Sequence, residues 1–214
     1  MISVLTGDIV GSRELSSEKR TDLDGKLKGA ALRSGLGDSL EVFRGDSWQC
    51  LCSPHHSAIE RALHFRAFLL GKYEIDTRIS IGIGAVESLH REKVSLSQGE
   101  AFELSGLGLS SLPDHRRLEI SLSETLEPSS LPFLNAACAL LDGITSEWTA
   151  RQSLAVALAL TDDNQYELAN RFDPPISAQA FGKHLAKAQW KLLKHALESI
   201  QRGLSLILPP ESEK

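Results

Sequence analysis

The opening stretch MISVLTGDIVGSR constrains the fold most, because it places an acid at the end of a core strand. Residues 2–5 form a short apolar run of β-type residues, and this pattern predicts a buried strand that runs into Gly7-Asp8. A second acid, Asp46, lies in VFRGDSWQCL, where Gly-Asp between two strand-like runs predicts a hairpin. An ionised carboxylate at the end of a core strand is costly unless a cation faces it. The sequence therefore raises the question of which cation serves Asp8 and Asp46.

Alternating patterns along the chain predict an α+β fold in two parts. The expected order up to residue 125 is β-α-β-β-α-β-α-β, and its first six elements match the split β-α-β unit of a ferredoxin-like sheet. The expected strands cover residues 2–5, 40–43, 48–52, 78–86 and 116–122, with helices over 14–32, 54–70 and 97–112. A Pro/Ser stretch then precedes helices expected at about 131–143, 147–160, 163–172 and 177–205. We therefore divide the chain into a ferredoxin-like palm domain, 1–125, and an all-helical domain, 126–214.

Composition excludes several classes of protein. The net charge of −5 gives no overall basic footprint, so a nucleic-acid surface would have to be local. No basic segment followed by a long apolar run opens the chain, and no stretch of about 18 apolar residues occurs, so we expect no membrane partner. Cys50 and Cys52 lie in an apolar strand, where buried free thiols are expected rather than a bridge. A reduced, cytoplasmic protein is the expectation.

The predicted topology brings the two acids together, since the end of the first strand lies beside the hairpin of the second and third. Neighbouring carboxylates repel unless a proton or a cation bridges them. Mg²⁺ accepts one or two carboxylates together with other oxygens, and the carbonyl of Ile9 would be a natural third ligand. A plainer interpretation has Asp8 capping the helix that follows or accepting loop amides, and Asp46 serving as an ordinary turn residue.

Several short motifs resemble those of known families. TGDIVGSR resembles the opening strand of class III nucleotidyl cyclases, and FRGDSWQ is similar to the hairpin of GGDEF diguanylate cyclases. RISIGIGAV and GEAFELSGLGL resemble the strand and helix that follow in both groups, and the whole combination resembles the SatD-like family. The resemblance implies a metal-dependent palm that uses Mg²⁺ or Mn²⁺, with Asp8, Ile9 and Asp46 as metal ligands.

The sequence also departs from the cyclase pattern. Ser47 replaces the second GGDEF acid, and GEAFELSGLGL lacks the Asn and Arg that cyclases offer to ribose and phosphate. Arg13 and Arg44 are the remaining candidates for phosphate contacts, so Arg13, Arg44 and Ser47 form the expected nucleotide-binding set. Without a cation at the transferred phosphoryl group a large electrostatic contribution to the rate is lost. We therefore expect nucleotide or metal binding rather than turnover, and assign no catalytic residue.

The helical tail resembles a helix-turn-helix. Asp173-Pro174-Pro175 ends one expected helix, and Ser177 is a suitable N-cap for the next. In that second helix the expected groove-facing residues are Gln179, Lys183, His184 and Lys187. The alternatives are a solvated lysine face or a dimerisation unit, because residues 126–214 hold at least as many acids as bases.

These observations predict a regulatory protein. Its degenerate cyclase-like palm would bind a divalent metal or a nucleotide, and its tail would contact DNA or a second subunit in a homodimer. The alternatives are an active two-metal nucleotidyl cyclase or transferase, and a structural adaptor that keeps a relict site.

Overall fold

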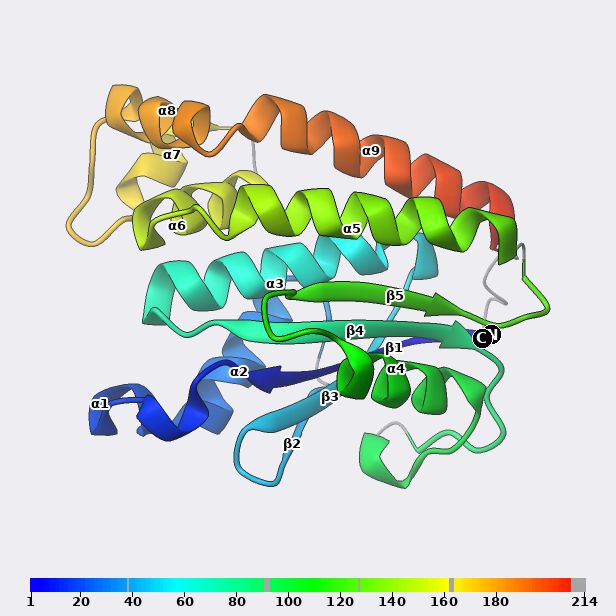
Figure 1. Cartoon of the computed structure of the whole chain (residues 1–214). Helices are drawn as coiled ribbons and strands as arrows, with labels where there is room; N and C mark the ends of the chain where they lie inside the picture. Colours follow the sequence, from blue (N-terminus) through cyan, green and yellow to red (C-terminus); the bar gives the residue numbers. More distant parts are fainter. Residues whose placement is uncertain (38, 91–92, 127, 162–163, 209–214) are drawn as a thin grey trace.

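The computed structural model describes residues 1–37, 39–90, 93–126, 128–161 and 164–208. In this part of the chain five strands form one mixed sheet in the order β2-β3-β1-β4-β5, and helices surround it, which confirms an α+β fold (Figure 1). The strands are β1 (Ile2–Ile9), β2 (Glu41–Phe43), β3 (Ser47–Cys52), β4 (Thr77–Gly84) and β5 (Leu118–Leu122).

β1 is the central strand, because it pairs antiparallel with both β3 and β4. The first strand extends further than its apolar run predicts: pairing continues through Asp8, which lies opposite Ser47 on one side and Arg78 on the other. β5 is parallel to β4 and forms one edge of the sheet.

The hairpin between β2 and β3 forms where Gly-Asp predicts it. Phe43 pairs with Ser47, and Arg44 and Gly45 between them have φ of 54° and 86°. Turns of this kind need positive φ, which glycine adopts without steric cost and other residues adopt at some cost. The turn fixes the place of Asp46, the residue that leads back into β3.

The helices lie on both faces of the sheet and above it. α4 packs across β1, β4 and β5 on one face, while α2 and α3 cover the other, and α6 stacks on α3 (Figure 1). Their bounds are α1 (Ser17–Arg20), α2 (Leu23–Arg33), α3 (Ala58–Tyr73), α4 (Glu100–Ser111), α5 (Leu131–Thr145), α6 (Ala150–Ala159), α7 (Gln165–Asn170), α8 (Ala178–Lys187) and α9 (Trp190–Ile207).

α4 approaches the sheet closely because β4 carries glycines on that face. A Cβ at Gly82 would lie 2.3 Å from the carbonyl oxygen of Ala101, and one at Gly84 would lie 3.1 Å from the Ala101 amide nitrogen. The glycine alternation of RISIGIGAV therefore serves close backbone approach. Thr6 of β1 also reaches α4, with 2.8 Å between its hydroxyl oxygen and that of Ser105.

Two expected helices are interrupted. The segment 14–32 is a short 3₁₀ turn followed by α1 and α2, with Asp22 at φ 53° before α2. The single helix expected over 177–205 is wrong, because it divides into α8 and α9 at Gln189, whose φ is 58°.

The packing explains the break between α8 and α9. Phe181, Leu185 and Ala188 are buried on α8, whereas Leu193 and Leu197 are buried on α9. Ala188 and Leu193 are five residues apart, so a continuous helix would point them in directions about 140° apart. The left-handed residue between the helices brings both apolar stripes to the core. Leu192, which would continue the stripe of Leu185 and Ala188 in a single helix, is exposed.

α5 runs along the open edge of the sheet and closes it. The Asn135 side-chain amide donates to the Ile120 carbonyl at 2.9 Å and accepts from the Ile120 amide at 3.0 Å. Asp142 accepts from the amides of Arg117 and Leu118 at 2.9 and 3.1 Å. On the edge strand β5, the Leu118 amide and both backbone groups of Ile120 are therefore bound by two side chains of one helix.

The buried apolar core continues across residue 125. One cluster of buried residues includes Trp48 and Phe65 beside the sheet and also Val156, Phe181 and Leu197 of the later helices. Cys50 and Cys52 are buried and form no disulfide, as expected, and Cys138 is also buried outside any disulfide. No helix in the described ranges combines the length and the apolar character needed to cross a membrane.

Candidate functional site at the sheet edge

Asp8 and Asp46 lie at the same end of the sheet, where the central strand β1 ends beside the β2–β3 hairpin. The site at this end, formed by Asp8, Asp46 and their neighbours, is the sheet-edge site. Asp8, the penultimate residue of β1, lies opposite Ser47, the residue that follows Asp46, and the Ile9 amide donates to the Asp46 carbonyl at 3.1 Å. Two segments that are far apart in the sequence therefore meet where the first strand ends. The side chains of the two acids, however, have different partners.

The Asp8 carboxylate is bound by an arginine from the neighbouring strand. Arg78 donates from Nε to Oδ1 at 2.9 Å and from Nη2 to Oδ2 at 2.5 Å, a bidentate geometry. Arg78 also donates to the Leu112 carbonyl at 3.3 Å, and it lies 3.7 Å from the fully exposed Asp114. The hydrogen bond that Arg78 donates to Asp8 raises the pKa of Arg78, although partial burial acts in the opposite direction. The cation that faces Asp8 is thus a side chain of the protein.

Asp46 is bound by a hydroxyl. Ser12 Oγ donates to Asp46 Oδ2 at 2.6 Å, which ties the loop after β1 to the β2–β3 hairpin. Arg13 and Arg44 are exposed, one next to Ser12 and the other two residues before Asp46, while Ser47 is half-buried. The expected nucleotide-binding residues therefore share this edge of the sheet.

A divalent metal does not fit this donor set in the arrangement that the structure has. Both oxygens of Asp8 accept from Arg78, and no group of three or more His, Cys, Asp or Glu side chains in the described ranges could hold a metal ion. Binding of Mg²⁺ or Mn²⁺ would require Asp8 to leave its arginine. Arg78 is not among the site residues predicted from the sequence; the antiparallel pairing of TRISIGIG with the first strand is the signal that could have found it.

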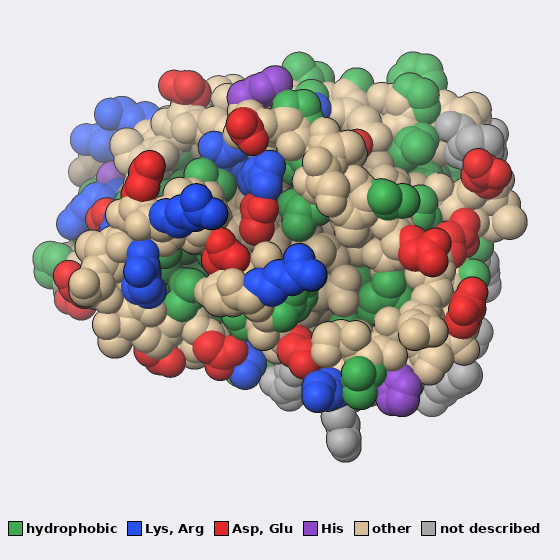
Figure 2. Space-filling model, turned by 60° about the horizontal axis from the view of Figure 1, so that its bottom comes forward, with side chains coloured by type: hydrophobic (Ala, Val, Ile, Leu, Met, Phe, Trp, Pro, Cys, Tyr) green, Lys and Arg blue, Asp and Glu red, His purple; other side chains and the backbone are tan. Residues whose placement is uncertain are grey.

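A second ion network lies at the same end of the sheet. Asp76 accepts from Arg66 Nε at 2.6 Å and from Arg117 Nε at 3.0 Å, and Arg66 also donates to Thr145 Oγ1 at 2.6 Å. Burial raises the pKa of Asp76, but the two arginines outweigh burial and hold that pKa below its usual value. Figure 2 shows Lys and Arg side chains gathered on its left half, interspersed with acidic ones.

The expected DNA-facing residues lie on α8. Gln179, Lys183 and Lys187 are exposed, which follows from the spacing of the buried positions of this amphipathic helix. His184 is half-buried and stacks on Phe172, with ring centroids 6.0 Å apart and planes at 12°. Burial lowers the pKa of His184, and the charges of Arg151 and Lys187 lower it further.

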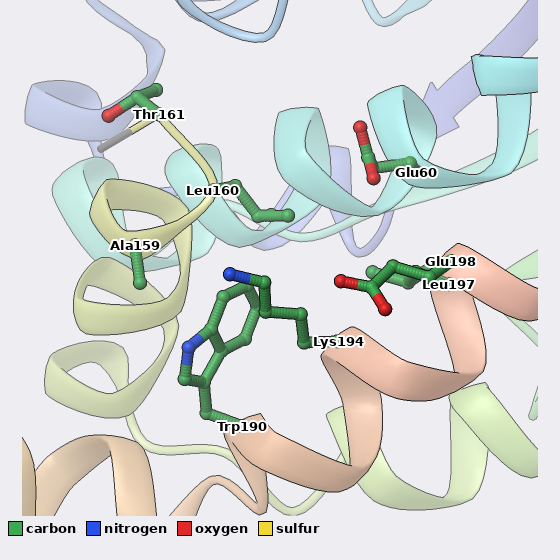
Figure 3. Close-up of a pocket in the computed structure, with 8 residues that line it drawn as sticks. All are labelled: Glu60, Ala159, Leu160, Thr161, Trp190, Lys194, Leu197 and Glu198. Carbon is green, nitrogen blue, oxygen red and sulfur yellow. The ribbon is translucent and has the colours of Figure 1, made fainter. Parts of the chain in front are cut away.

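A separate cavity of about 210 Å³ lies between α3, α6 and α9 (Figure 3). Trp190 and Leu160 form its apolar wall, and Glu60, Lys194 and Glu198 bring charge to it. Burial raises the pKa of Glu60, the nearby Arg61 lowers it, and Glu198 raises it again. The cavity shares no lining residue with the sheet-edge site.

Comparison with known proteins adds no assignment. No family model matches the chain, and no curated protein or solved structure is significantly similar to it. The resemblance to SatD-like proteins, cyclases and GGDEF domains therefore depends on the short motifs alone.

Proposed function

We propose that this chain is a regulatory protein that binds a nucleotide at the sheet edge and contacts duplex DNA through α8. The observation that carries the proposal is the hydrogen bond from Ser12 to Asp46, because it joins segments 34 residues apart and sets Arg13 and Arg44 on one edge. Two guanidinium groups beside one edge suit phosphate oxygens, which they bind through charge-assisted and often bidentate hydrogen bonds.

The strand order supports the likeness to a palm. The order β2-β3-β1-β4, with α2 after β1 and α3 after β3, is that of a β-α-β-β-α-β unit with all of these strands antiparallel to their neighbours. By this likeness, the nucleotide site that we propose lies at the end of β1, beside the β2–β3 hairpin. Ser47 is the first residue of β3 after the turn, so its hydroxyl would be a further hydrogen-bonding group for the nucleotide.

The arginine on Asp8 decides the chemistry that we propose. Arg78 binds both oxygens of Asp8 and compensates its charge, so the site that we propose recognises phosphate through the protein's cations. A divalent ion, as the motif resemblance implies, would supply charge neutralisation of the triphosphate. Asp8 and Asp46 would be its carboxylate ligands after displacement of Arg78.

Titration calorimetry with a nucleoside triphosphate tests the nucleotide site. We expect binding in EDTA, loss of at least tenfold in affinity for Arg13→Ala combined with Arg44→Ala, and no change for Lys183→Ala on α8. Binding that requires Mg²⁺ and disappears in Asp8→Asn would instead assign the site to the metal. No binding of any triphosphate would refute the nucleotide proposal.

The same variants test the contact with DNA. The exposed Lys183 and Lys187 would lie against phosphates, and each phosphate contact adds to the steepness with which affinity falls as salt rises. Lys183→Ala combined with Lys187→Ala should flatten this dependence for a random duplex, whereas the Arg13 and Arg44 variant should not. A wild type that ignores duplex DNA at low salt would contradict this part of the proposal.

A further inference from the structure

The outward side of α5 is an apolar stripe with a seven-residue repeat. Phe133, Ala136, Leu140 and Gly143 are all exposed, and Phe133 and Leu140 keep 77% and 73% of their surface in contact with solvent. The spacings of three, four and three residues are those of successive core positions in a coiled coil. The opposite side of α5 is already used, because Cys138, Leu141 and Thr145 are buried against the protein. The stripe therefore has the pattern of an interface but has no partner in the described chain.

Large and small residues alternate along the stripe. Phe133 and Leu140 occupy one type of core position, and Ala136 and Gly143 occupy the other. When two such helices pair antiparallel, each type of position meets the other type, so every large side chain meets a small one. Around a two-fold axis near residue 138, Phe133 would face the partner's Gly143, and Leu140 would face the partner's Ala136. Parallel pairing would instead place Phe133 against the partner's Phe133 and would leave a gap where Gly143 faces the partner's Gly143.

Charge favours the same arrangement. From Leu131 to Leu141 the helix carries no charged residue, and Asp142 is buried and bound to Arg116 at 2.8 Å. The next position of the stripe is the exposed Glu147, just beyond the end of α5. Antiparallel pairing brings this carboxylate to the N-terminal end of the partner helix, whose dipole attracts negative charge. Parallel pairing would set two such carboxylates side by side.

From these observations we propose that the chain forms a two-fold homodimer by antiparallel pairing of α5. The stripe supplies both halves of the contact, as an isologous interface requires. A helix of 15 residues is roughly 22 Å long, so the buried area is small beside the roughly 800 Å² per partner of a standard interface. The dimer should therefore depend on concentration.

Analytical ultracentrifugation of the full chain tests the dimer. The average mass of the wild type should rise with concentration from 23.3 kDa towards twice that value. Leu140→Glu should stay monomeric with an unchanged circular dichroism spectrum. The control Leu107→Glu, at a 69% exposed leucine on α4, should dimerise like the wild type. A wild type that is monomeric throughout, or a control that dissociates as well, would overturn the proposal.

Cross-linking tests the register. A mixture of Ala136→Cys and Leu140→Cys proteins should form a cross-linked heterodimer with a short bis-maleimide, and neither protein alone should do so efficiently. The wild type, whose natural cysteines are buried, gives the background level of cross-linking. Efficient cross-linking of each variant with itself would indicate parallel pairing and refute the proposed register. If the wild type is instead a monomer that sediments with anionic phospholipid vesicles, and Leu140→Glu no longer sediments with them, the stripe binds a membrane surface and the dimer proposal is refuted.

Discussion

At the scale of single residues, Arg78 determines what Asp8 can do. The guanidinium occupies both oxygens of the carboxylate at 2.9 and 2.5 Å, and the two side chains are about one quarter exposed. A partly buried ion pair of this kind contributes little when whole, but removal of one partner leaves the other charge without compensation. The pair therefore matters to stability mainly when one of its partners is removed.

We predict that Arg78→Leu lowers the free energy of unfolding by about 2 kcal/mol, because it leaves the Asp8 carboxylate partly buried and unpaired. Asp114→Asn is the matched control, since Asp114 lies 3.7 Å from the same arginine but is fully exposed, and it should have no measurable effect. Urea unfolding measures both. Equal effects of the two variants would show that the bidentate contact is not what stabilises this edge.

The convergence of Asp8 and Asp46 follows from sequence, but their partners do not. A strand that ends in Gly-Asp and a Gly-Asp hairpin are local signals, and the topology that joins them follows from the order of the elements. Arg78 and Ser12 are ordinary residues in the sequence, and only the register between strands brings Arg78 onto Asp8. The metal ligand set was predicted from the positions of the acids alone, without the arginine that the neighbouring strand places on Asp8.

At the scale of elements, the break between α8 and α9 depends on one residue in a left-handed conformation. Gln189 has φ 58° and connects two helices whose buried stripes are out of phase. The expected single helix followed the stripe from Phe181 to Ala188 and continued it to residue 192, although the structure buries Leu193. Periodicity alone does not detect a change of phase, because leucines at 192 and 193 satisfy either pattern.

Gln189→Gly should stabilise the protein by up to about 1 kcal/mol, since glycine adopts this conformation without the steric cost that glutamine has. Gln189→Val should destabilise it, because a β-branched side chain fits positive φ poorly. Thermal unfolding of the two variants beside the wild type gives the comparison. A stabilising valine would mean that the chain does not need the left-handed turn.

At the scale of the whole molecule, the later helices belong to the same buried core as the sheet. His64 of α3 is buried at the contact with α6, where it hydrogen-bonds to the backbone of Ala157. Burial lowers the pKa of His64 from 6.5 to about 4, although that hydrogen bond raises it somewhat. The folded protein thus keeps this imidazole neutral at a pH at which the unfolded chain protonates it.

Stability should therefore fall as the pH drops from 6.5 towards 4, because protons then bind preferentially to the unfolded chain. One pKa unit corresponds to about 1.4 kcal/mol, so the full effect is about 3 kcal/mol. His64→Gln should lose this dependence in urea unfolding across that range. Asp76, whose pKa lies below its usual value, should still destabilise both proteins at lower pH. An unchanged slope in the variant would contradict the role of His64.

The two edges of the sheet limit how this molecule can associate. On β5, Asn135 binds both backbone groups of Ile120 and Asp142 binds the Leu118 amide, and β2 at the other edge is only three residues long. Neither edge therefore presents a long open row of backbone groups, which hinders pairing with a strand of another chain. We expect larger assemblies of the folded chain to be built through helices.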